Sequence, residues 1–146
     1  MVRICLLSII LLFTPKLEKK AYKIIAKEYQ VDFVFLDPDP RDDLEGRLYE
    51  VMTDKGPKGY AFIGRSKSKF EAFDYLVLFN DSLTIHKVKV LVYRENYGGE
   101  IGSTRWLRQF IGLDKPINRV SAISGATISV NSLHYSVNKL LRKLGE

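Results

Sequence analysis

Strand-like segments joined by short turns occupy the middle of this chain and limit the folds that it can adopt. Residues 48–52 and 59–64 form one pair, with a Gly-Pro turn between them. Residues 73–79 and 83–93 form a second pair across an Asn-Asp-Ser turn. Pairs of strands closed by such short turns are antiparallel, so the chain is expected to build a mostly antiparallel sheet.

The last of these segments also indicates how the sheet is oriented. Lys87 and Lys89 alternate with Val88, Val90 and Val92, which predicts one solvated face and one core face.

Helical patterns flank the strands. Residues 17–29 carry charges on both sides of apolar positions and predict a helix, followed by a strand at 31–36. From Ile128 to Leu144 apolar residues recur at three- and four-residue steps, and Gly145 is placed to end that helix. The prediction is an α+β domain with a mostly antiparallel sheet, edge helices and a long C-terminal helix.

The first residues differ in composition from the rest. Arg3 precedes an unbroken apolar run at 4–13, which is shorter than the ~20 residues of a membrane span but fits a secretory leader. A buried N-terminal strand or helix is the alternative. We expect a signal peptide or membrane-anchoring leader at 1–14, whose cleavage stays open, and a single domain at 15–146, hence an extracytoplasmic, membrane-associated protein. The only cysteine, Cys5, lies in the leader, so no disulfide is expected.

Charge and the remaining side chains restrict the function classes. The net charge is +6, but the basic residues are scattered, which favours a solvated surface over a nucleic-acid site. The acid-rich segment 37–43 is not expected to bind calcium, because prolines separate its acids and Arg41 takes a ligand position. His86 and His134 have no paired ligand spacing, so no metal is expected. Without a dinucleotide fingerprint, phosphate loop or serine elbow, a stand-alone enzyme is not indicated.

The segment directly ahead of the C-terminal helix carries the strongest functional signal. It reads Ser124, Gly125, Ala126, Thr127, and no Asp or Glu occurs anywhere in residues 121–138. A helix N-terminus without acids, reached through a glycine, suits an anion such as phosphate. The alternative is an ordinary turn and cap.

Ser-Gly-Ala-Thr followed by Ile-Ser resembles the flavinylation motif of the FMN-binding domain family. That family includes the C subunit of the sodium-pumping NADH:quinone oxidoreductase and the G subunit of the Rnf complex. A Tyr-Arg-Glu strand end at 93–95, a glycine-containing loop and a Phe-Ile-Gly helix end at 110–112 resemble the same family, in the same order. The resemblance covers residues 47–144.

The resemblance implies an FMN-carrying electron-transfer domain with FMN joined by a phosphoester to Thr127, and Ser124, Gly125 and Ala126 shaping the phosphate site. Ser121 stands where the family commonly has Asp, which leaves reversible FMN binding open. The implied partners are a flavin transferase for maturation and membrane or extracytoplasmic redox proteins. A cofactor-free exported binding module is the competing interpretation.

A flavin ring also needs a flat apolar wall and a cation near the edge where negative charge grows on reduction. Trp106 and Phe110, in a predicted short helix at 104–111, are candidates for the wall, and core packing explains them equally well. Arg94 or Lys115 is the candidate cation.

Overall fold

The computed structural model describes residues 15–39 and 46–146. Residues 1–14 and 40–45 lie outside the described residues; they include the predicted leader and residues 40–43 of the acid-rich segment 37–43. The elements in chain order are α1 (Pro15–Tyr29), β1 (Val34–Pro38), β2 (Gly46–Thr53), β3 (Gly56–Lys67), β4 (Ala72–Phe79), β5 (Ile85–Val92), the 3-10 helix η3 (Gly99–Gly102), α2 (Thr104–Leu107), the 3-10 helix η4 (Arg108–Phe110) and α3 (Thr127–Leu144). The predicted α+β class is confirmed.

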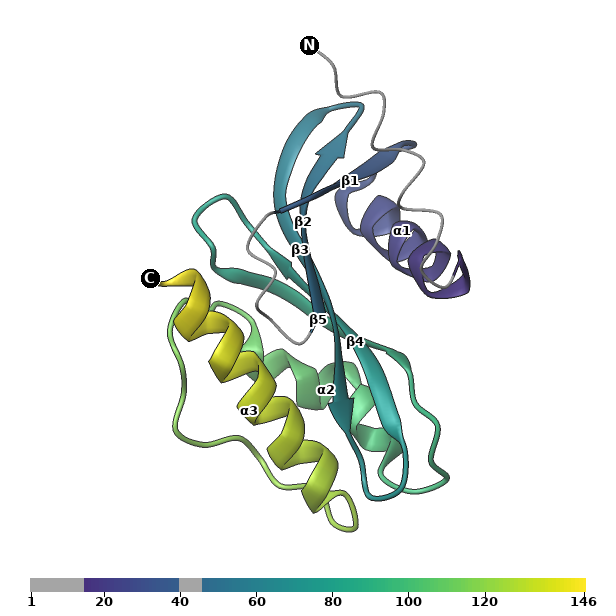
Figure 1. Ribbon diagram of the computed structural model, residues 1–146, viewed down its shortest axis with the longest axis vertical. Helices are drawn as coiled ribbons and strands as arrows, with labels where there is room; N and C mark the ends of the chain where they lie inside the picture. Colours follow the sequence, from purple (N-terminus) through teal and green to yellow (C-terminus); the bar gives the residue numbers. More distant parts are fainter. Residues whose placement is uncertain (1–14, 40–45) are drawn as a thin grey trace.

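The five strands form one sheet in the order β1-β2-β3-β4-β5, and each strand is antiparallel to its neighbours (Figure 1). The strand order follows the chain order, and the predicted turns at 54–57 and 80–82 join β2 to β3 and β4 to β5. The long β3 strand pairs with β4 from Tyr60↔Phe79 to Lys67↔Ala72. This register carries the tip of the β3–β4 hairpin to the same end of the sheet as the N-terminus of α3.

Helices cover both faces of the sheet (Figure 1). On one face α1 packs Ala21 and Ile25 into a cluster that includes Leu76 and Leu78 of β4. On the other face α3, α2 and η4 enclose the larger cluster. That cluster includes Phe62, Phe73, Val77, Phe79, Trp106, Phe110, Leu133 and Val137.

The predicted solvated face of β5 is therefore wrong in part, because α1 lies over it. Glu28 of α1 reaches β5, where its carboxylate lies 3.1 Å from Lys87 Nζ and 3.0 Å from His86 Nε2. Lys20 of the same helix donates a hydrogen bond to the carbonyl oxygen of Leu91. Polar groups of β5 thus meet polar side chains of α1 and remain only partly exposed to water.

The helix α3 follows its predicted pattern. Leu133, Val137, Leu140 and Leu141 are all buried, as the three- and four-residue spacing requires. Gly145 ends the helix, and its N–H donates to the carbonyl of Leu141 at 3.1 Å. The predicted helix at 104–111 is instead divided into α2 and η4.

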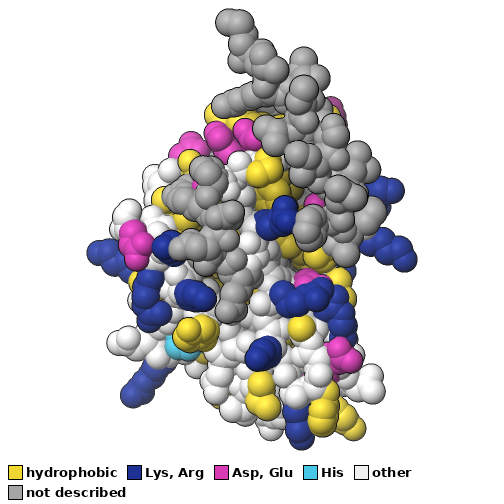
Figure 2. Space-filling model, in the orientation of Figure 1, with side chains coloured by type: hydrophobic (Ala, Val, Ile, Leu, Met, Phe, Trp, Pro, Cys, Tyr) yellow, Lys and Arg dark blue, Asp and Glu magenta, His cyan; other side chains and the backbone are white. Residues whose placement is uncertain are grey.

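The surface agrees with scattered charge. On the face shown in Figure 2, Lys and Arg side chains are spread between apolar and acidic ones instead of gathering in one block. Within residues 15–39 and 46–146, no helix has both the length and the apolar composition that a membrane crossing requires.

Candidate functional site

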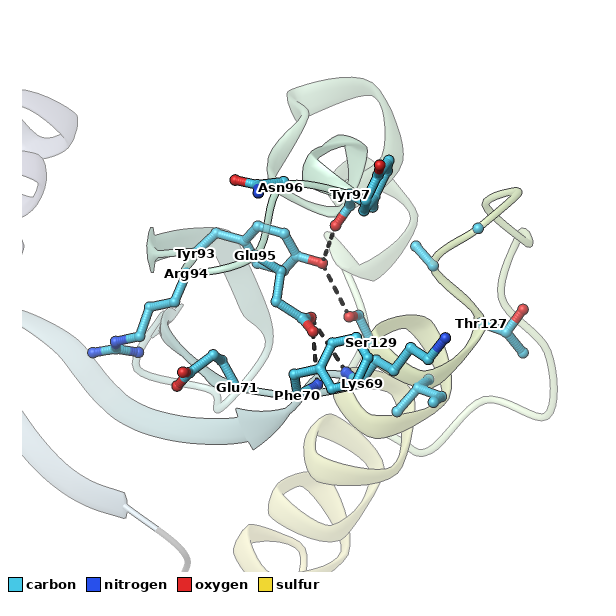
Figure 3. Close-up of a pocket in the computed structure, with 13 residues that line it drawn as sticks. Lys69, Phe70, Glu71, Tyr93, Arg94, Glu95, Asn96, Tyr97, Thr127 and Ser129 are labelled. Atoms are coloured by element: carbon cyan, nitrogen blue, oxygen red, sulfur yellow. Dashed lines mark hydrogen bonds between the residues drawn. The ribbon is translucent and has the colours of Figure 1, made fainter.

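Three segments that are far apart in sequence converge on one pocket of about 650 Å³ (Figure 3). They are the tip of the β3–β4 hairpin, the segment that follows β5, and the first turn of α3. The lining residues are Lys69, Phe70, Glu71, Tyr93, Arg94, Glu95, Asn96, Tyr97, Gly125, Ala126, Thr127, Ile128 and Ser129. A concave space of this size is typical of small-molecule and cofactor sites.

A tight turn delivers the chain to the start of α3. The N–H of Ala126 donates to the carbonyl of Ile123 at 3.1 Å, and Gly125 has φ 78°. A Cβ at Gly125 would meet nothing within 4 Å, so the left-handed backbone, rather than crowding, favours glycine there. Ala126 is the N-cap of α3 and offers no side-chain hydrogen bond, and the first turn holds no acid. The positive end of α3 therefore has no compensating group of its own.

Thr127 is the first residue of α3, and it is exposed at the edge of the pocket. Its hydroxyl belongs to the same turn as the uncapped amides. A phosphate held by those amides would lie next to this hydroxyl.

The loop before this turn is held by core residues. The indole Nε1–H of Trp106 donates to the carbonyl of Ser121 at 2.7 Å, and the N–H of Ser121 donates to Gln109 Oε1 at 2.8 Å. Trp106 and Phe110 are themselves buried, with their rings edge to face at 5.5 Å between centroids. Neither residue lines the pocket, so the structure places both in the core, where they anchor the loop that leads to Thr127.

Polar side chains of α3 fix the same loop further upstream. Asn138 accepts from the N–H of Ile117 at 3.0 Å and donates to its carbonyl at 2.8 Å. His134 Nε2 lies 2.7 Å from that carbonyl oxygen. A long irregular segment is thereby given a defined path to the pocket.

A carboxylate after β5 pins the tip of the β3–β4 hairpin. Glu95 accepts hydrogen bonds from the N–H of Phe70 at 2.7 Å and of Lys69 at 3.2 Å. The tip is closed internally by Ser68, whose N–H donates to the carbonyl of Glu71 at 2.8 Å. The Ser68 hydroxyl is the main cause that lowers the pKa of Glu95; desolvation opposes it, and the backbone amides of Phe70, Lys69 and Glu71 lower the pKa further. Glu95 is therefore an ionised clamp on the hairpin tip.

A hydroxyl network joins the same tip to α3. Ser129, which is buried, has its Oγ 2.6 Å from Ser68 Oγ and 3.2 Å from Tyr93 Oη. The Tyr93 hydroxyl donates to the carbonyl of Tyr97 at 2.8 Å. The three segments of the pocket are thus tied to one another by hydrogen bonds, and the pocket is preformed.

The pocket has an apolar wall that the protein leaves uncovered. Phe70 is 82% exposed, Tyr97 83% and Ile128 49%. These are three of the six large apolar side chains that are exposed among the described residues, and all three line this pocket. Exposed aromatic rings beside a preformed hollow indicate a flat apolar ligand.

Arg94 lines the pocket but is held by other groups. Its Nη2 lies 2.6 Å from Asp74 Oδ2, and its Nη1 donates to the carbonyl of Ala72 at 2.9 Å. Arg65 Nε binds the other carboxylate oxygen of Asp74 at 2.7 Å. Burial alone would raise the pKa of Asp74, but the hydrogen bonds and charges of the two arginines outweigh it, so the pKa is lowered. In Figure 3 the guanidinium of Arg94 extends to the side opposite Thr127.

The structure thus brings together four of the eight predicted site residues, namely Thr127, Gly125, Ala126 and Arg94. Ser124 lies in the adjacent turn and Lys115 in the upstream loop; both are exposed and outside the pocket lining. The lining residues that sequence reasoning missed are Lys69, Phe70, Glu71, Tyr93, Glu95, Asn96, Tyr97, Ile128 and Ser129. Two sequence signals could have indicated the apolar wall: Phe70 is an aromatic residue in the hairpin turn, and Tyr97 is an aromatic residue directly before the Gly98-Gly99 pair.

These features fit FMN. The volume, the uncovered rings and the open space at Gly125 accommodate a flavin, and the acid-free end of α3 accommodates its phosphate. No cluster of three or more His, Cys, Asp or Glu side chains that could hold a metal occurs in the described part of the chain.

Comparison with known protein families gives a match over part of the chain. Curated proteins gave no match to the chain. The model of the FMN-binding domain matches residues 71–142, a segment that contains β4, β5, α2 and nearly all of α3. Residues 71–142 therefore belong to the FMN-binding domain family, and FMN is the cofactor of this domain.

Proposed function

We propose that this chain is an extracytoplasmic, membrane-associated electron-transfer domain that carries FMN through a phosphoester to Thr127. One observation carries the proposal: Thr127 presents an exposed hydroxyl at the pocket edge, on the first residue of a helix whose N-terminus is uncapped. A covalent link needs both the accessible oxygen and the anion-binding amides.

Different residues of the pocket would bind the phosphate and the ring of the cofactor. The Thr127 Oγ1 would be the oxygen joined to phosphorus, and the first-turn amides of α3 would hold the remaining phosphate oxygens. Phe70 and Tyr97, which line the pocket and are largely exposed, would flank the ring. Because a free phosphate does not esterify spontaneously, a transferase must supply FMN with a leaving group, such as the nucleotide half of a flavin dinucleotide. The threonine proton then passes to a base of that transferase.

When bound, FMN supplies reversible electron acceptance and donation. The chain positions the ring at its surface, since Phe70 and Tyr97 stay largely exposed. An accessible ring suits exchange with a protein partner. A carrier role, rather than catalysis on a small substrate, therefore fits the pocket best.

The location and partners are inferred from the sequence. The apolar run at 4–13 supports export and attachment to a membrane. The net charge of +6 favours docking with an acidic redox partner. Reversible FMN binding is the second candidate, and it is favoured by Ser121 in the position of the family Asp.

The test is intact mass of protein produced together with a flavin transferase. Wild-type protein is expected to gain the mass of FMN less one water, and the flavin should survive denaturation. Thr127→Ala should lose this mass. Ser124→Ala is the matched control, since it removes an exposed hydroxyl of the same motif that does not line the pocket. A Thr127→Ala protein that keeps a denaturation-resistant flavin would refute the site, and a flavin released from wild type on denaturation would favour reversible binding.

A further inference from the structure

We propose that Lys69, at the tip of the β3–β4 hairpin, is the cationic partner of the FMN phosphate. This inference rests on the proposed placement of that phosphate beside Thr127. Lys69 lies two residues before the segment that matches the family, so its contribution comes from the part of the chain that the match does not include.

The pocket offers few cations for this role. Its lining contains two basic residues, Lys69 and Arg94. The guanidinium of Arg94 is bound by Asp74 and by the carbonyl of Ala72. Lys115 lies outside the lining. Lys69 is therefore the pocket cation that no described carboxylate holds, and its ammonium lies 5.2 Å from the centre of the Phe70 ring.

The backbone of Lys69 is fixed close to the first turn of α3. Its neighbour Ser68 has its Oγ 2.6 Å from Oγ of Ser129, which lies two residues after Thr127. On the other side Glu95 accepts the N–H of Lys69 itself at 3.2 Å. The backbone of Lys69 is therefore held in place beside the first turn of α3, and only the flexible side chain is free to reach the phosphate site. In Figure 3 it extends toward the side of the pocket where Thr127 lies.

The distribution of charge supports the same assignment. The acids that line the pocket are Glu71 and Glu95, and Figure 3 places both away from Thr127. Glu95 is already engaged by backbone amides. The first turn of α3 contributes no charged side chain. An anion at Thr127 would therefore meet the helix end from one side and the Lys69 ammonium from the other.

The experiment is ³¹P NMR of the FMN-loaded protein, with the reduction potential measured on the same samples. The variants are Lys69→Gln, Lys69→Arg and the control Lys67→Gln. Lys67 belongs to the same hairpin, but its exposed side chain does not line the pocket. Because Lys69 is exposed at a turn, its substitution should leave the fold intact, which circular dichroism can verify.

Lys69→Gln is expected to shift the flavin ³¹P resonance, and Lys67→Gln to leave it at the wild-type position. Lys69→Arg should stay nearer to wild type than Lys69→Gln does. The potential of Lys69→Gln should stay within about 30 mV of wild type, which is a tenfold change for a two-electron couple. An unmoved resonance in Lys69→Gln would overturn the proposal, as would equal shifts in Lys69→Gln and Lys67→Gln. A changed potential with an unmoved resonance would place Lys69 at the ring instead. Flavin retained by Thr127→Ala would refute the attachment site separately, by mass.

Discussion

Gly98 offers a sharp test of how the pocket is assembled. It has φ 78° and lies where the segment after β5 meets the start of α3. A Cβ added there would lie 2.6 Å from the Cβ of Ala126 and 2.9 Å from the hydroxyl oxygen of Tyr93. Gly98→Ala should therefore strain the backbone and push against the residue that precedes Thr127.

Two costs add in this variant. A side chain in the left-handed region costs about 1–2 kcal/mol. Overpacking a tight contact costs a further ~1–3 kcal/mol. The sum is a large part of the roughly 5–15 kcal/mol by which domains are stable. Gly112 provides the matched control, because its φ is 87° but a Cβ there meets nothing within 4 Å. Both substitutions lower the conformational entropy of the unfolded chain by a similar amount, so this effect cancels when the two variants are compared with each other.

The assay is urea denaturation of wild type, Gly98→Ala and Gly112→Ala. We expect the free energy of unfolding of Gly98→Ala to lie about 1–3 kcal/mol below that of Gly112→Ala. Adding Ala126→Gly should recover part of the loss, since it removes the closest atom while the Tyr93 contact remains. Gly98→Ala should also lower flavin loading. If Gly98→Ala were no less stable than Gly112→Ala, the packing of this segment against α3 would be wrong.

Two further substitutions test the electrostatics and the maturation signal. Asp74→Asn should lower the free energy of unfolding at pH 7 by about 2–3 kcal/mol, less than for a fully buried pair because Arg65 is 60% exposed. Since the pKa of Asp74 is lowered in the folded protein, its contribution is fully present above the unfolded pKa of about 3.9 and is lost progressively as pH falls from there through the lower pKa of the folded state. Denaturation at pH 7 and pH 3 should therefore show a smaller difference at pH 3, and an unchanged difference would contradict this account. Ser121→Asp restores the acid that the family commonly has at this position, so it should raise the rate of flavin incorporation by the transferase. The Ser121 side chain is exposed and therefore accessible to that enzyme, and its backbone is fixed by the hydrogen bond from Trp106. An unchanged rate would remove the argument that Ser121 favours reversible binding.

Local signals in the sequence were sufficient for much of the fold. Turn residues between alternating segments specified the antiparallel hairpins, and the spacing of apolar residues specified α3 together with its end at Gly145. The same local reasoning found the turn at Gly125 and the acid-free helix end. These features depend on neighbours within a few positions, which the sequence shows directly.

Features that depend on distant partners were not predictable in this way. The pairing of Lys87 with Glu28 requires α1 to return across the sheet, so β5 was expected to have a solvated face. Arg94 is held by Asp74, and that ion pair forms between β4 and the end of β5. Trp106 has the spacing of either a core or a ligand wall, and only the packing of α2 on the sheet places it in the core. The exposed wall of the pocket comes from a hairpin tip and a loop, whose meeting depends on the strand register.

The most direct test of the central claim is peptide mapping of the mature, flavin-loaded protein. Trypsin cleavage after Arg119 and Lys139 isolates residues 120–139, which contain Thr127. Fragmentation should place the mass of FMN less one water on Thr127 and leave Ser124 unmodified. An unmodified peptide from a protein that is yellow before denaturation, or a flavin on any other residue, would contradict the account.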